Sequence, residues 1–187
     1  TVHRFLDLGI PSKTTAVKRE GPRDLIFPMA STIQFDFPER GTEPPCSVTW
    51  YDGTSNRPER PAELPEGQNL GRAGKIIRGK DTTFIGSSHG SPLSIIPEER
   101  REELASTLPE VEVGSNHYLN FVRAVKGEEA TRSPFRVSGP LCQMFCLGMI
   151  AQRLGGSCTS LLLAHALDPQ PVGHVVEHAH VREEGVV

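Results

Sequence analysis

The stretch Met29–Phe37 alternates between two kinds of side chain, and it constrains the fold more than any other part of the sequence. One side of the alternation is apolar apart from one small serine: Met29, Ser31, Ile33, Phe35 and Phe37. The other side is mostly polar: Ala30, Thr32, Gln34 and Asp36. This period of two is typical of a β-strand with one face on a core and one face toward water. A strand of this kind predicts an α+β fold with an open, mainly antiparallel sheet and helices on one face.

The strand has clear limits and several predicted neighbours. Pro28 precedes it and Pro38 follows it, and proline is disfavoured inside a sheet. Further strands are predicted from alternation and from the spacing of glycine and proline: Lys13–Glu20, Cys46–Asp52, Lys75–Lys80, Thr82–Ile85 and Leu93–Ile96. We expect Cys46–Asp52 to pair with Met29–Phe37, because its own alternation continues the same two faces.

Four helices are predicted from apolar spacing and from capping residues. They run over Val2–Leu8 with Gly9 as the cap, from Pro97 to near Ser106, from Ser115 to Gly127, and from Gly139 to Gly155. In the third helix, one face carries Tyr118, Phe121, Val122 and Val125. The fourth helix is apolar on nearly all sides, which predicts burial on most sides. We expect the third and fourth helices to cover the sheet.

Length and charge limit the classes of function. The 187 residues suit one domain, predicted over residues 1–156, with a tail over 157–187 of different character. The formal net charge is −3 and both signs are interspersed, so we expect no nucleic-acid partner. No apolar run reaches the ~20 residues of a membrane helix, so we expect no membrane partner. Because the chain starts at Thr1 in mid-helix pattern, we expect a fragment or a processed chain, cytoplasmic or, if an upstream signal was lost, periplasmic.

The cysteines and histidines do not form a standard metal pattern. The four cysteines are Cys46, Cys142, Cys146 and Cys158. They contain no C-x-x-C pair, and we expect small buried thiols. Histidines gather in the tail, at His165, His174, His178 and His180. Their spacing matches no standard zinc site, so we expect no metal and a loosely packed tail.

Two glycine-rich segments invite catalytic interpretations that their context does not support. Residues 71–75 lack the four-residue gap of a phosphate-binding loop, and no dinucleotide fingerprint follows a strand. Residues 86–90, Gly-Ser-Ser-His-Gly, match the letters of a hydrolase nucleophile elbow with Ser88 as nucleophile and His89 beside it. An elbow is followed by a long helix, whereas another strand is predicted here, so a hydrolase is the weakest hypothesis.

Four residues are candidates for binding a substrate, each with a structural alternative. His117 opens the third helix, where it could bind a hydroxyl group or simply pack at the helix start. Trp50 and Tyr51 could stack on a sugar ring or pack in the core. Arg78 could bind a ligand or lie in an interface between subunits. Trp50 and Tyr51 end a strand beside a long segment, from Asp52 to about Gly74, which is either a plain surface loop or functional.

Several segments in order resemble the C-terminal domain of the Gfo/Idh/MocA family of NAD(P)-dependent oxidoreductases. They are Leu6-Asp7-Leu8-Gly9-Ile10-Pro11, Thr49-Trp50-Tyr51-Asp52-Gly53, Pro65-Glu66-Gly67, Phe84-Ile85-Gly86, Asn116-His117-Tyr118 with Phe121 to Gly127, Ser133-Pro134-Phe135, Gly139-Pro140-Leu141 and Leu147 to Gly155. Each segment alone is weakly specific, and the ordered set is more so. The resemblance covers residues 1–156, and the tail does not match the family.

The resemblance implies the second half of a two-domain enzyme. In that family a Rossmann domain binds NAD or NADP, and the second domain supplies part of a sugar pocket and a subunit interface. The resemblance therefore implies no cofactor bound by this chain alone, a sugar-like or polyol substrate, and a homo-oligomer formed through the open sheet face. The family's catalytic histidine and cofactor lysine have no counterpart here, since His3 lies too close to Leu6-Asp7-Leu8-Gly9 to match. The alternative is a stand-alone interaction or carbohydrate-binding module without catalysis.

Overall fold

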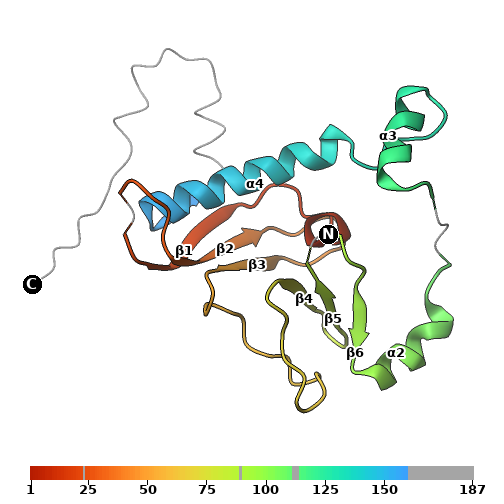
Figure 1. Cartoon of the computed structure of the whole chain (residues 1–187), viewed down its shortest axis with the longest axis horizontal. Helices are drawn as coiled ribbons and strands as arrows, with labels where there is room; N and C mark the ends of the chain where they lie inside the picture. Colours follow the sequence, from red (N-terminus) through yellow and green to blue (C-terminus); the bar gives the residue numbers. More distant parts are fainter. Residues whose placement is uncertain (23, 89, 111–113, 160–187) are drawn as a thin grey trace, which may run out of the picture.

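The protein has an α+β fold with two antiparallel sheets and a few helices (Figure 1). The computed structural model describes residues 1–22, 24–88, 90–110 and 114–159. In chain order the elements are α1 (Val2–Phe5), β1 (Lys13–Glu20), β2 (Ala30–Phe37), β3 (Cys46–Asp52), β4 (Gly74–Arg78), β5 (Thr83–Ser87), β6 (Ser94–Ile96), α2 (Glu98–Leu104), the 3-10 turn η1 (Ala105–Thr107), α3 (His117–Val125), α4 (Phe135–Leu154) and β7 (Ser157–Thr159). Among the helices of these residues, none combines the length and apolar character needed to cross a membrane.

The larger sheet is built around β2, as its sequence predicts. Its strand order is β3-β2-β1-β7, and each neighbouring pair is antiparallel. β2 pairs with β3 along its whole length, from Ser31 opposite Asp52 to Phe37 opposite Cys46. The pairing of β1 with β2 shifts register between Ala16 and Lys18, which leaves a bulge at that point. The predicted pairing of Cys46–Asp52 with the central strand is therefore confirmed.

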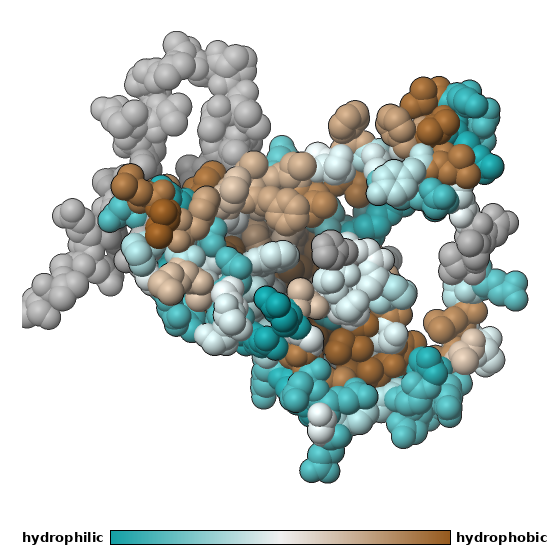
Figure 2. Space-filling view, in the orientation of Figure 1, coloured by the Kyte–Doolittle hydropathy of each residue, from teal (hydrophilic) through white to brown (hydrophobic). Residues whose placement is uncertain are grey.

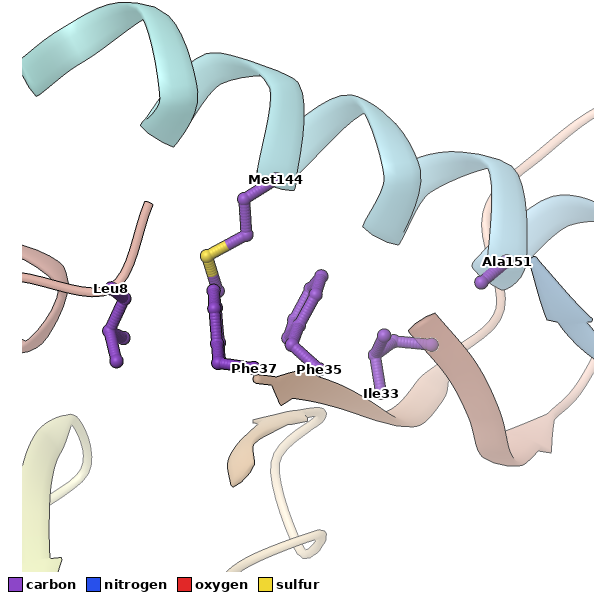
Figure 3. Packing of buried hydrophobic residues seen from close by; sticks show 6 residues of the cluster. All are labelled: Leu8, Ile33, Phe35, Phe37, Met144 and Ala151. Carbon is purple, nitrogen blue, oxygen red and sulfur yellow. The ribbon is translucent and has the colours of Figure 1, made fainter. Parts of the chain in front are cut away.

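One face of this sheet is covered by α4, and the core lies between them. Six buried residues form the core cluster (Figure 3): Leu8, Ile33, Phe35, Phe37, Met144 and Ala151. The helix approaches β2 closely at Gly148, where an added Cβ atom would lie 2.8 Å from Phe35 Cζ. The absence of a side chain at Gly148 therefore lets the Phe35 ring pack against the helix backbone.

A second sheet holds the three later strands, a division that the sequence did not predict. Its order is β4-β5-β6, again antiparallel, with Ile77 and Ile95 buried. The long segment before β4 also belongs to this part, because Leu64 is buried and the Thr83 hydroxyl donates to Glu63 Oε1 at 2.6 Å. The Arg60 side chain ties this segment together by donating to four backbone carbonyls, those of Pro61, Leu64, Pro65 and Gln68.

The expectation that the third and fourth helices both cover the sheet is wrong, because among the described helices only α4 does so. α3 lies beyond the start of α4, away from the strands (Figure 1). Its predicted apolar face exists but faces solvent, with Tyr118 83% exposed and Val125 73% exposed. α4 is also not buried on most sides, since Phe145 and Ile150 are more than two-fifths exposed. Among the described elements, α4 packs against β1, β2 and β7, and its other side is left exposed.

Three further sequence predictions are corrected by the structure. α4 begins at Phe135, four residues before the predicted start at Gly139, and contains Pro140. α1 ends at Phe5 rather than at Leu8, although Leu8 is still buried in the core. The prediction of buried thiols is wrong for Cys142 and Cys146, which are exposed because they lie on the side of α4 that faces away from the sheet.

The predicted tail falls only partly within the described residues. Its first residues form β7, where Ser157 pairs with Thr15 of β1. Its four histidines, His165, His174, His178 and His180, lie outside the described residues.

Candidate functional site

The face of the larger sheet opposite α4 is polar. Because the β2 side chains Ile33, Phe35 and Phe37 point toward α4, their neighbours along each strand point the other way. This open sheet face carries Lys13, Thr15, Lys18, Glu20, Gln34, Asp36, Ser47, Thr49 and Tyr51. Ala30 and Thr32 lie on the same face but are buried, 5% and 6% exposed, where the Asn56 amide donates to the Thr32 hydroxyl. It offers hydroxyl, amide and paired charged groups, which suits a hydrogen-bonding partner surface more than an apolar ligand.

The charges on the open sheet face are balanced by local contacts. Asp36 accepts hydrogen bonds from Ser47 Oγ at 2.6 Å and from Gln34 Nε2 at 2.7 Å. These bonds, the one from Ser47 first, together with the nearby charge of Lys13, lower the pKa of Asp36. Lys18 and Glu20 form an ion pair of 2.7 Å at the other end of β1. The face therefore keeps both signs of charge at neutral pH without a net excess of either.

A hollow of about 710 Å³ lies between α3 and the start of α4. It is lined by four aromatic rings and by smaller residues: His117, Tyr118, Asn120, Phe121, Val122, Thr131, Ser133, Pro134 and Phe135. α3 begins here because the Asn116 side chain accepts a hydrogen bond from Leu119 N at 3.0 Å, a typical N-cap. His117 follows this cap, exposed, with its ring edge to face with Tyr118.

The wall of this hollow is held by a hydrogen-bond cluster, here named the Asn120 clasp: Ser115, Asn120, Glu129 and Arg132. Asn120 is 3% exposed, and its amide donates to Glu129 Oε1 at 2.9 Å and accepts from Arg132 N at 3.0 Å. Ser115 Oγ donates to Glu129 Oε2 at 2.6 Å, and Arg132 donates to the Ser115 carbonyl. Because these contacts occupy the Asn120 amide, Asn120 supports the hollow and is not available to a ligand.

The Asn120 clasp is expected to open in acid. The hydrogen bond from Ser115 is the largest effect on the pKa of Glu129, which is lowered despite a smaller opposing effect of burial. Since the folded pKa lies below the unfolded one, the carboxylate stabilises the clasp above the ordinary glutamate value of about 4.3. This stabilisation is lost as the pH falls below that value and through the folded pKa. We expect the α3 amide signals in NMR spectra to shift in this window while those of Met144 to Leu154 in α4, a helix without Asp, Glu or His, do not.

Two variants test which carboxylate is responsible. Glu129→Gln is expected to loosen α3 already at pH 7 and to remove this acid-dependent change. Glu128→Gln is the matched control, because Glu128 is exposed and its contact with Lys126 is long, at 3.9 Å. An acid transition in α3 that persists in Glu129→Gln would contradict this assignment.

The four candidate residues from the sequence do not converge on one site. His117 lies at the hollow, on α3. Trp50 lies on the edge strand β3, on the same side of the sheet as α4, and is 55% exposed. Tyr51 lies on the opposite side, on the open sheet face, and Arg78 lies in the second sheet, where it donates to the Glu59 carbonyl at 3.2 Å. Trp50 is thus not a core residue, and Arg78 helps to hold the long segment.

The turn at Ser88 does not have the structure that the hydrolase hypothesis requires. After Ser88 the chain turns into β6, which pairs antiparallel with β5, and no helix follows the turn directly. A nucleophile elbow needs a strand, a sharp turn and a helix, so Ser88 does not occupy one. His89 lies outside the described residues.

The described residues contain no strand, glycine-rich turn and helix of the Rossmann kind. Within them, only β6 leads directly into a helix, α2, and Ile96 and Pro97 join the two without a glycine. A Rossmann turn carries glycines at this place, where the backbone approaches the pyrophosphate. In the same part of the chain, no group of three or more His, Cys, Asp or Glu side chains is arranged to hold a metal ion.

Sequence reasoning missed the Asn120 clasp and the hollow that it supports. The residues of the clasp come from a loop, a helix and a second loop, so no short spacing reveals them. The one available signal is a polar Asn120 within an apolar stretch of helix, between Leu119 and Phe121. The open sheet face, in contrast, is visible in the alternation of Ala30–Phe37.

Comparisons with protein-family models, with curated proteins and with solved structures find no match to this chain.

Proposed function

We propose that this chain is the substrate-side and assembly part of an NAD(P)-dependent oxidoreductase that acts on a sugar or polyol, with the cofactor bound by a separate domain. The observation that carries the proposal is the one-sided architecture of the larger sheet. α4 covers one face, while the face with Thr15, Gln34 and Thr49 is mainly polar. This arrangement agrees with the resemblance of residues 1–156 to the C-terminal domain of the Gfo/Idh/MocA family.

In this proposal, the hollow at α3 forms one wall of the substrate pocket. A sugar presents apolar ring faces and polar edges, and the hollow offers both kinds of partner. The rings of Tyr118 and Phe121 can stack on a ring face, and the His117 imidazole can hydrogen-bond a hydroxyl group. Hydride transfer requires the nicotinamide cofactor, so we expect this chain alone to be inactive.

The coding sequence upstream of Thr1 tests the oxidoreductase proposal most directly. A segment that encodes a strand, a G-x-G-x-x-G turn and a helix within one βαβ unit supports the proposal, because the cofactor domain would then be part of the same protein. Tight binding of NADH or NADPH by the 187-residue chain alone contradicts it, because this proposal leaves cofactor binding to the other domain.

The alternative is a carbohydrate-binding or interaction module without catalysis. The observation that favours it is Trp50, which is 55% exposed on an edge strand and is the only tryptophan. Exposed aromatic rings bind sugar faces without further machinery. Quenching of Trp50 fluorescence by sugars, in a protein whose gene encodes no cofactor domain, favours this alternative over the oxidoreductase.

The assembly part of the proposal predicts a dimer that depends on the open sheet face. Thr49 is exposed on this face, midway along the edge strand β3 and opposite Gln34. We expect Thr49→Lys to weaken the dimer at least about tenfold, since a lysine buried in a symmetric interface loses hydration and repels its copy, and tenfold corresponds to ~1.4 kcal/mol. Sedimentation equilibrium measures the change.

A matched control separates the open sheet face from a general effect of added charge. Thr54→Lys introduces the same side chain at an exposed loop position after β3 and is expected to leave the dimer unchanged. A wild-type chain that remains monomeric at concentrations well above micromolar, or equal weakening by both variants, contradicts assembly through this face.

A further inference from the structure

The side of α4 that faces away from the sheet gathers three sulfur atoms. Cys142, Cys146 and Met149 follow one another at spacings of four and three residues, so they lie along one face of the helix. Both thiols are free and exposed, and Met149 is 48% exposed. The opposite face, with Met144 and Leu147, is buried. Figure 2 shows mostly apolar side chains along this part of the surface.

The helical spacing prevents the two thiols from closing on each other. Side chains four residues apart on a helix have Cβ atoms about 5–6 Å apart. A disulfide needs Cβ atoms about 3.5–4.5 Å apart, so Cys142 and Cys146 cannot form one without distorting the helix. A metal ion between the sulfurs removes this conflict, because two metal–sulfur bonds of about 2.3 Å separate the sulfurs by up to about 4.6 Å.

The donor set selects a soft ion. Two thiolates and a thioether favour Cu(I) over ions that prefer oxygen or nitrogen ligands. α4 contains no Asp, Glu or His, and its charged residues are Arg136 and Arg153, six positions before Cys142 and seven after Cys146. Three sulfur ligands also leave a zinc ion without its usual fourth protein ligand.

The surroundings of the three sulfurs favour a compact, poorly hydrated complex. Phe145 and Ile150 lie on the same exposed part of the helix and are 47% and 41% exposed. Their apolar side chains flank the sulfurs and limit the water around a bound ion, as the apolar shell of a metal site does.

We propose that Cys142, Cys146 and Met149 form a binding site for one thiophilic monovalent metal ion, and that this ion is Cu(I). Binding releases one proton from each thiol to solvent, and the copper remains in the +1 state. The site is intramolecular and lies on the opposite side of the larger sheet from the open sheet face, so it does not depend on the proposed oxidoreductase role or on the dimer.

Anaerobic titration of the reduced chain with Cu(I), against a chromogenic Cu(I) chelator, tests the site. We expect one equivalent of copper per chain and an ultraviolet charge-transfer band from the thiolates. Cys142→Ser and Cys146→Ser are each expected to weaken binding at least a hundredfold, since each removes a thiolate. Met149→Leu is expected to weaken it by a smaller factor, near tenfold.

Cys46→Ser is the matched control, because Cys46 is partly buried on β3 and lies away from α4's exposed side. It is expected to leave affinity and stoichiometry unchanged. Circular dichroism checks that each variant is folded, and the exposed positions of Cys142 and Cys146 make loss of folding unexpected. The proposal is overturned by failure of the wild type to compete with the chelator, by undiminished binding in the Cys142→Ser/Cys146→Ser double variant, or by half an equivalent of copper with a copper-dependent increase in mass.

Discussion

Phe35→Ala is expected to lower the free energy of unfolding by about 3–5 kcal/mol, the range for removing a buried phenylalanine side chain. Phe35 is 3% exposed and packs against the backbone of α4 at Gly148. The space left by the ring cannot be refilled easily, because the backbone of α4 and the strand β2 limit how far the neighbours can move. Urea unfolding followed by circular dichroism measures the change.

Phe145→Ala is the matched control for this prediction. It removes the same side chain from the same helix–sheet pair, but Phe145 lies on the outer side of α4 and is 47% exposed. We expect a loss below about 1 kcal/mol. Equal losses for Phe35→Ala and Phe145→Ala would contradict the placement of α4 on β2, since the two rings would then be equally buried.

Gly53→Ala is expected to cost about 2–5 kcal/mol, because it combines two unfavourable effects. Gly53 has φ +114°, a conformation that a residue with a Cβ atom adopts only under strain. The added Cβ atom would also lie 2.6 Å from Ala30 Cβ and 2.9 Å from Ala30 Cα, so the backbone at the start of β2 has to move. Thermal unfolding and the amide signals of β2 and β3 report the effect.

Gly67→Ala separates the two contributions. Gly67 also has a positive φ, +83°, but nothing lies within 4 Å of its added Cβ atom. We expect a loss of about 1–2 kcal/mol from backbone strain alone. A loss at Gly53 no larger than at Gly67 would show that Ala30 does not lie under the turn after β3.

The local elements were predictable because their signals lie within short windows of sequence. The alternation over Met29–Phe37 predicted β2 and its buried face from Ser31 to Phe37, and the neighbouring strand β3 followed from the same period. Met29, which the alternation placed on the buried face, lies before the strand and is 75% exposed. Asn116 and Gly127 mark the two ends of α3, where the N-cap hydrogen bond and a positive φ are found. The polar character of the open sheet face was contained in the same alternation. Each of these features depends on neighbours a few residues apart.

The candidate site was less predictable, because its parts are assembled by long-range contacts. His117 was identified as a candidate, but the hollow beside it also needs Phe135 and the Asn120 clasp. In the sequence, Trp50, Tyr51 and Arg78 were equally plausible substrate-binding residues. In the structure, Trp50 and Tyr51 lie on opposite faces of the larger sheet, and Arg78 lies in the second sheet.

The sequence by itself determined the order of the main strands and helices and the apolar sides of β2, α3 and α4, although not the end of α1 or the start of α4. Only the tertiary structure decided that the strands divide into two sheets, that α4 is the one described helix that covers the larger sheet, and that the apolar sides of α3 and outer α4 are exposed. The physical reason is that an apolar face on a helix or strand favours burial, but it becomes buried only where the fold brings another surface against it. For α4 that surface is the face of β2, and Cys142 and Cys146 remain exposed because they point away from it.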